Sequence, residues 1–188
     1  MALKLIGLTG VARSGKDSFF KLVEYKFPER KVVRLALADA LKADIDSFLK
    51  QKVGISAFTS FDDEKTFIRP MLVAYGKIMR LKTMGRYWVD KLQPRLDEEL
   101  GKDSLVVVTD IRYDIYPKDE VHWLREQNGG YLVHISRISP DGSIVPPPNE
   151  DEAYNDEKIR KKANYLLSWP TRPDILSLMP FLDFLDVL

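Results

Sequence analysis

The chain has 188 residues, which suits one compact domain. Apolar residues make up 45% and charged residues 30%, a balance typical of a globular domain with an ordinary core. A formal net charge of +1 predicts no strong field toward nucleic acid or a membrane, and the absence of cysteine excludes disulfides, cysteine-ligated zinc and a thiol nucleophile.

Apolar periodicity predicts strands that alternate with helices. In chain order these are a strand over 3–9, a helix over 16–27, a strand over 31–37, helices over 39–52, 64–83 and 87–100, a strand over 104–110, a helix over 117–128, a strand over 131–137, a helix over 150–163, a strand over 164–169 and an apolar terminal helix over 174–188. The segments 53–63 and 138–150 are expected to be loops. Strands separated by helices predict a three-layer α/β domain, with a parallel sheet of about five strands and helices on both faces.

Proline and glycine mark several boundaries. Pro117 opens one predicted helix, and Gly129 and Gly130 close it. Pro70 and Pro94 fall inside helical patterns. We therefore expect Pro70 to interrupt or start its helix, and Pro94 to kink or break its own.

The stretch GLTGVARSGKDS contains the spacing G-x-x-x-x-G-K between a predicted strand and a predicted helix. In that context the loop N–H groups and the helix N-terminus point at phosphate oxygens, and Lys16 reaches the β and γ phosphates of ATP. The alternative, a glycine-rich turn capped by Asp17, does not explain the lysine. The predicted phosphate-binding residues are Gly10, Val11, Ala12, Arg13, Ser14, Gly15, Lys16, Asp17 and Ser18.

Asp17 stands where the usual motif has a serine or threonine that binds Mg²⁺. A carboxylate is also a hard oxygen ligand, and Ser18 supplies the next hydroxyl. Asp110 ends a buried strand at the sheet edge where open α/β sheets bind ligands. We therefore predict a Mg²⁺ site at Asp17, Ser18 and Asp110, with ATP as cosubstrate. Asp17 has an alternative role, because an acid in the first turn of a helix is itself stabilising.

A phosphorylated acceptor would require further cations, and the sequence contains candidate arginines. Asp39 follows the second strand, and it either orients an acceptor and assists its proton transfer or caps the next helix. The expected acceptor-binding residues are Asp39, Lys42, Arg69, Arg80, Arg86, Trp88 and Arg112. Trp88 and Tyr87 either stack on a base or pack in the core, and core packing is expected for one of them.

A lid is expected over about 138–160, and a helical acceptor region over about 39–100, both within a single domain spanning 1–188. A lid excludes water, so that the phosphoryl group passes to the acceptor. Arg137 stands at the entrance of the lid and is expected to stabilise the transferring group. The expected catalytic residues are thus Lys16, Arg137 and Asp39.

Four segments together resemble the bacteriophage-type deoxynucleoside monophosphate kinases. They are GVARSGKDS, ALADALK, RPMLVAYGKIMR…GRYWVDKL and VVVTDIRYDIYPKDEVHWLREQNGGYLVHISR. The resemblance covers about residues 3–137 and returns weakly at KKANYLLSW, whereas PNEDEAYNDE departs from the family pattern in the lid. It implies a P-loop kinase fold, ATP and Mg²⁺, a deoxynucleoside monophosphate as acceptor and often a homodimer. It also implies that Arg69, Trp88 and Arg112 face the acceptor, and that Asp17 is usual at its position.

Other functions stay open at this point. The same loop would serve a kinase of another phosphorylated metabolite, such as dephospho-coenzyme A or phosphomevalonate, or an NTPase that acts with a partner. A nucleotide-binding module without catalysis is a further alternative. We expect neither nucleic acid nor a membrane as a partner. Without a signal-peptide pattern, a cytoplasmic protein is expected, in the host if a phage encodes it.

Overall fold

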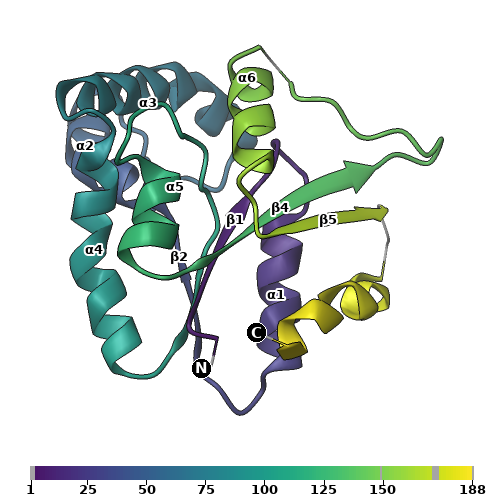
Figure 1. Ribbon diagram of the computed structural model, residues 1–188. Helices are drawn as coiled ribbons and strands as arrows, with labels where there is room; N and C mark the ends of the chain where they lie inside the picture. Colours follow the sequence, from purple (N-terminus) through teal and green to yellow (C-terminus); the bar gives the residue numbers. More distant parts are fainter. Residues whose placement is uncertain (1–2, 149, 171–173, 188) are drawn as a thin grey trace.

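The computed structural model describes residues 3–148, 150–170 and 174–187, and in it five parallel strands form one sheet. The strand order is β2-β3-β1-β4-β5, so the first strand of the chain lies at the centre (Figure 1). The strands are β1 (Leu5–Thr9), β2 (Val32–Leu35), β3 (Leu105–Val108), β4 (Tyr131–Ile138) and β5 (Tyr165–Pro170). The helices are α1 (Lys16–Lys26), α2 (Leu37–Lys52), α3 (Asp62–Lys82), α4 (Arg86–Gly101), α5 (Glu120–His122) with the π-helical turn η1 (Trp123–Gln127), α6 (Glu150–Arg160) and η2 (Ile175–Val187).

Alternate side chains of the strands enter two cores, one on each face of the sheet. In β3, Leu105 and Val107 join one core, and Val106 and Val108 join the other. The first core lies against α1 and η2, and the second against α2, α4, α5, η1 and α6. Both faces of the sheet are therefore covered, which explains the unbroken apolar runs in the sequence and confirms the three-layer α/β prediction.

Neither predicted helix breaks at its proline. α3 runs from Asp62 to Lys82 with Pro70 inside it, and α4 runs from Arg86 to Gly101 with Pro94 inside it. Both prolines are exposed. Packing of the opposite faces, through residues such as Ile68 and Leu96, supports each helix on both sides of its proline. The predictions of an interruption at Pro70 and a break at Pro94 were wrong, because tertiary packing outweighed the local cost of proline.

Two other predicted helices differ from the structure. The segment 117–128 becomes helical only from Glu120, because the Asp119 side chain accepts a hydrogen bond from the Glu120 N–H and caps the turn. The turns after His122 are π-helical. The terminal segment is the 3₁₀ helix η2 and not an α-helix, and Leu182 anchors it in the core shared with α1. Residue 188 of that prediction lies outside the described residues. In the described ranges, no helix combines the length and apolarity that crossing a bilayer requires.

Candidate functional site

The loop between β1 and α1 has the backbone geometry that anion binding requires. Gly10 and Gly15 have φ angles of 127° and 105°, and Arg13 between them has φ 63°. A Cβ on Gly10 would lie 2.2 Å from the carbonyl oxygen of Ile135, so only glycine fits there. Left-handed residues among right-handed ones turn successive N–H groups toward one concave side. The strand-loop-helix arrangement inferred from the motif is therefore present, with α1 beginning at Lys16.

Lys16 is folded across this loop. Its Nζ donates to the carbonyl oxygens of Gly10 at 2.7 Å and Val11 at 2.8 Å. Burial, and secondarily the nearby positive charge of Arg112, lower the pKa of Lys16 to about 8. Two cationic groups thus share one partly buried site, which is an arrangement that favours an anionic ligand.

The edge strand β5 contacts the loop through Trp169 and supports it. The Trp169 Nε1–H donates to the carbonyl oxygen of Ser14 at 2.9 Å. A Cβ on Gly15 would lie 2.8 Å from that same Nε1, so the indole ring lies directly against the glycine. The apolar pattern predicted a strand at Trp169 but not this contact, which links two segments far apart in the chain.

Asp110 lies at the carboxyl edge of the sheet, just after β3, and it is buried. Its two carboxylate oxygens accept the backbone N–H groups of Leu37 and Ala38, both at 2.8 Å. Burial raises the pKa of Asp110, and these two N–H groups and Arg112 oppose the rise. Asp110 therefore caps α2, so any metal contact would use its remaining lone pairs, for example through water.

Asp17 and Asp39 are linked by a residue that the sequence analysis missed. Arg34, on β2, donates to the Asp39 carboxylate at 3.0 Å and lies 3.9 Å from the Asp17 carboxylate. Asp39 is not the N-cap of α2, since Ala36 holds that position and Asp110 satisfies the helix N–H groups. The capping alternative for Asp39 was wrong. The available signal was a single arginine within the apolar strand pattern over 31–37.

Arg112 and Arg137 approach the loop from two sides. Arg112 is exposed, and its backbone N–H donates to the Glu120 carboxylate at 2.7 Å, which fixes the segment after β3. Arg137, at the end of β4, donates to the Arg13 carbonyl oxygen at 3.4 Å. The loop, Lys16 and both arginines are therefore brought together at one edge of the sheet.

Arg80 has a structural environment. It is 5% exposed, and its guanidinium pairs with Asp119 and Glu120, each at 2.7 Å. The Tyr113 ring lies over the same guanidinium, 3.9 Å from its carbon. The expectation that Arg80 contacts an acceptor disagrees with this geometry, because its charge is already paired inside the protein.

Arg86 and Trp88 also lie apart from the loop. Arg86 pairs with Asp90 one turn along α4, at 2.5 Å. Trp88 is 3% exposed and packs edge-on against Tyr75 and Tyr87. Its ring is core packing and is not accessible to a base, which corrects the expectation that the resemblance implied. Lys42 lies 5.7 Å from the Phe58 ring, and Arg69 is exposed on α3.

One acidic residue reaches into the loop from α6. The Ala12 N–H donates to the Glu152 Oε2 at 3.0 Å, so a carboxylate lies against the middle of the loop. Glu152 belongs to the stretch that departs from the family pattern. Nothing in its sequence context identifies it, because the contact spans most of the chain. Residue 149 of the expected lid lies outside the described residues.

Over residues 3–148, 150–170 and 174–187, no three or more histidine, aspartate or glutamate side chains gather in a way that could hold a metal ion.

Comparison with known proteins gives structural similarity only. No family model matches the chain, and no curated protein matches it. Dephospho-CoA kinase from Campylobacter jejuni superposes with a TM-score of 0.47 at 13% identity, covering 95% of this chain and 93% of that one. A sugar kinase from Janibacter sp. gives 0.44 at 15%, covering 98% and 95%. Shikimate kinase from Aquifex aeolicus gives 0.40 at 15%, covering 97% and 95%. All three TM-scores lie below 0.5, so the function has to be inferred from the residues of the site itself.

Proposed function

We propose that this chain transfers the γ-phosphoryl group of ATP to a deoxynucleoside monophosphate, giving ADP and a deoxynucleoside diphosphate. The observation that carries the proposal is the cationic edge of the sheet, where Lys16 and Arg112 are close enough for their charges to interact beside a loop of anion-binding geometry. A second phosphate-sized anion needs a second cation, and Arg112 meets that need. The family resemblance supports the choice of acceptor.

The chemistry in this proposal is positioning and charge neutralisation. An acceptor phosphate oxygen attacks the γ-phosphorus, the bond from that phosphorus to the β,γ-bridging oxygen breaks, and ADP leaves. Loop N–H groups and Lys16 hold the β and γ phosphates. Arg137 neutralises charge on the transferring group, while Arg112 and Arg69 hold the acceptor phosphate. Asp39, oriented by Arg34, faces the acceptor.

Mg²⁺ fits the oxygen donors available at this edge. Asp17 is exposed in the first turn of α1, Ser18 follows it, and Asp110 lies just after β3. The charges of Asp17 and Asp110 both act on Lys16. A bound Mg²⁺ would neutralise negative charge on the triphosphate. We propose that these residues hold the ion largely through water molecules.

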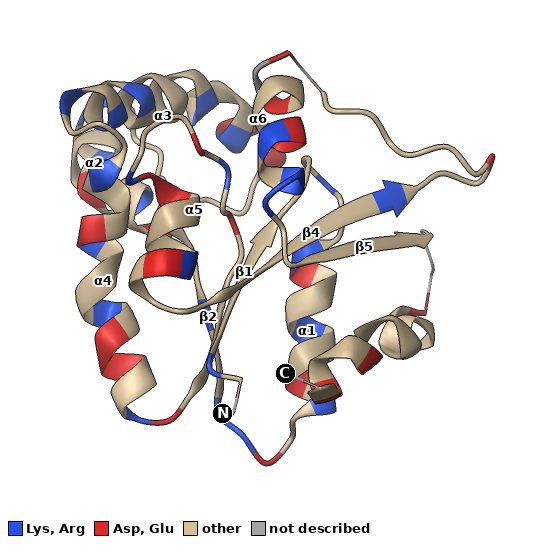
Figure 2. Cartoon of the chain, in the orientation of Figure 1, with Lys and Arg blue, Asp and Glu red and all other residues tan. Residues whose placement is uncertain are grey.

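We propose that residues 138 to 160 form a lid and that the helices α2 to α4 form the acceptor region, within one domain in the cytoplasm. We also propose that the chain binds neither nucleic acid nor a membrane. Figure 2 shows lysine and arginine interspersed with aspartate and glutamate on α4 and α6, and not gathered into a basic stripe.

Release of ADP tests the function directly. Purified protein is incubated with ATP and Mg²⁺ and each deoxy- or ribonucleoside monophosphate in turn, with a control that lacks an acceptor. We expect ADP release that depends on an acceptor and matches the diphosphate formed. ADP release without an acceptor would indicate an NTPase. Turnover only with dephospho-coenzyme A or phosphomevalonate would retain the kinase and replace its acceptor.

We further propose that two copies associate through α3. Phe67, Met71, Ala74, Ile78 and Leu81 recur every three or four residues and are all exposed, with Phe67 70% and Leu81 69% accessible. They lie away from the phosphate loop. The opposite side of α3 carries the buried Arg80 and the exposed Asp62, and the charge of Arg13 in the loop acts on the Asp62 carboxylate.

The occupant of this face is inferred from its symmetry and charge. Antiparallel pairing of two α3 helices about Ala74 would bring Phe67 of one copy opposite Leu81 of the other. The same pairing would bring the acidic first turn of each helix (Asp62, Asp63 and Glu64) toward the basic last turn of the other, which contains Lys82. Both features favour a second copy of the chain.

The substitution Ile78→Glu is expected to convert a dimer into a monomer in sedimentation experiments over a range of concentrations. Ile78 is 59% exposed, so the change adds a charge to the seam with little effect on the fold. Val73→Glu is the matched control, because Val73 is exposed on a different side of α3 and should leave the dimer intact. A monomeric wild type, or a dimeric Ile78→Glu variant, would rule out this interface.

A further inference from the structure

α6 is held against the sheet so that one of its faces looks toward the phosphate loop. The Nε2 of His134, on β4, lies 2.9 Å from the Asp156 carboxylate of α6. Ile159, one turn further, is buried in the core beside β3 and η1. Glu152 lies one turn before Asp156, on the same face of the helix. The contacts of Asp156 and Ile159 thus fix α6 against the sheet, and Glu152, near the start of the helix, reaches the loop.

The position of that carboxylate is the one that a phosphate oxygen would need. The Ala12 N–H, in the middle of the glycine-bounded loop, donates to Glu152 Oε2 at 3.0 Å. The same carboxylate acts on Lys16, since its negative charge raises the pKa of that amine against the effect of burial. A carboxylate resembles phosphate in its charge and in its acceptor oxygens, and both bind N–H groups in such loops.

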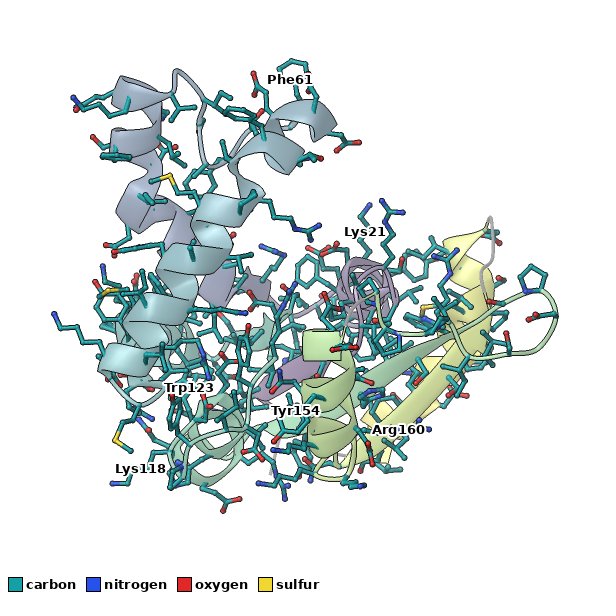
Figure 3. The ribbon with its side chains drawn as sticks, turned by 90° about the horizontal axis from the view of Figure 1, so that it is seen from above. Lys21, Phe61, Lys118, Trp123, Tyr154 and Arg160 are labelled. Atoms are coloured by element: carbon teal, nitrogen blue, oxygen red, sulfur yellow. The ribbon has the colours of Figure 1, made fainter. Side chains whose placement is uncertain are left out.

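Lys16 also has partners within the chain, because its Nζ donates to two carbonyl oxygens of the loop. The site thus has its lysine and at least one loop N–H satisfied from within the chain. Tyr154 marks α6 in Figure 3, and the Ala12–Glu152 hydrogen bond places the start of that helix against the loop that precedes α1. A nucleotide must replace these internal partners to bind.

We propose that Glu152 is an internal competitor of the nucleotide, occupying a phosphate position at Ala12 until the triphosphate displaces it together with the first turn of α6. This inference rests on the proposed nucleotide site and adds its regulation. Displacement by the triphosphate would free the N-terminal turn of α6, so phosphate binding and movement of the lid become one event. The lid segment would then sense the occupant of the loop.

The test compares Glu152→Gln with Glu157→Gln by calorimetric titration with ATP and, separately, with inorganic tripolyphosphate, without acceptor. Both substitutions remove one negative charge from α6. Glu157, however, is 72% exposed and pairs with Lys161 away from the loop. We expect Glu152→Gln to bind both probes roughly tenfold more tightly than wild type, because a charge-assisted hydrogen bond no longer competes. Glu157→Gln should bind them as wild type does.

Equal affinities for Glu152→Gln and wild type, or weaker binding by Glu152→Gln, would overturn the inference while leaving nucleotide binding intact. Failure of both proteins to bind either probe would overturn the nucleotide site as well. The Ala12 amide provides a readout without added ligand. Its proton resonance should lie downfield in wild type and move upfield in Glu152→Gln, and an unchanged resonance would show that the contact is absent. Circular dichroism checks that each variant is folded.

Discussion

Replacing Lys16 by alanine is expected to lower the rate of phosphoryl transfer by about 10²–10³-fold while leaving the fold intact. The Lys16 amine is expected to neutralise the negative charge that develops on the γ-phosphoryl group. Its removal should not destabilise the protein, because burial already disfavours the charged amine and lowers its pKa to about 8. Single-turnover ADP formation measures the rate, and thermal unfolding measures the stability.

Lys21→Ala is the matched control for this variant. Lys21 is exposed on α1, a little more than one turn after Lys16, and lies outside the loop. It should keep wild-type activity. If Lys16→Ala retained more than a small fraction of the wild-type rate, the loop would not be the catalytic phosphate site. If Lys16→Ala unfolded, the loop would be a structural turn.

Replacing Arg80 by methionine is expected to lower the free energy of unfolding by about 3–5 kcal/mol. The substitution leaves Asp119 and Glu120 buried without their cation. Those carboxylates also accept the backbone N–H groups of Arg112, Tyr113 and Ile115, so the segment after β3 loses its anchor. Urea denaturation measures the loss. Arg95→Met, at an exposed position on α4, is the control and should cost little.

The deficit of the Arg80→Met variant should grow with pH. Burial raises the pKa of Glu120 from 4.5 to about 8, and Arg80 is the first of the groups that oppose the rise. A carboxyl group with a higher pKa in the folded state binds more protons when folded, so stability falls as pH rises toward that value. Without Arg80 the pKa of Glu120 rises further, so the fall continues to higher pH. A deficit that is equal at about pH 6 and about pH 9, or that stays below about 1 kcal/mol, would contradict this account.

The sequence predicted those parts of the fold that local pattern controls. The buried strands and the loop before Lys16 were foreseen because apolar runs and paired glycines report on burial and backbone geometry at their own positions. The burial of Asp110 at the sheet edge also agrees with its place after a strand. Its cap on α2 was not foreseen, since that bond joins residues on different strands' loops.

The contacts that the sequence could not supply are those between distant segments. Arg80 was counted among acceptor ligands because its partners, Asp119 and Glu120, lie 39 and 40 residues away. Glu152 reaches Ala12 across 140 residues. The spacing of apolar residues along the sequence carries no information about contacts between such distant residues. The unbroken helices through Pro70 and Pro94 have the same origin, since packing against neighbours decided the outcome.

The strand that leads into the phosphate loop, β1, precedes the other strands of the sheet in the chain but occupies the centre of the sheet. Its partners come much later, because Leu5 pairs with Val106 and Ile6 with Tyr131. Trp169, which donates a hydrogen bond to the loop, lies still further along the chain. During synthesis the motif therefore has no strand partner until β3 and β4 have been made, and long-range pairing of this kind is slow. The support that Trp169 gives the loop depends on β5, which follows all the other strands in the chain.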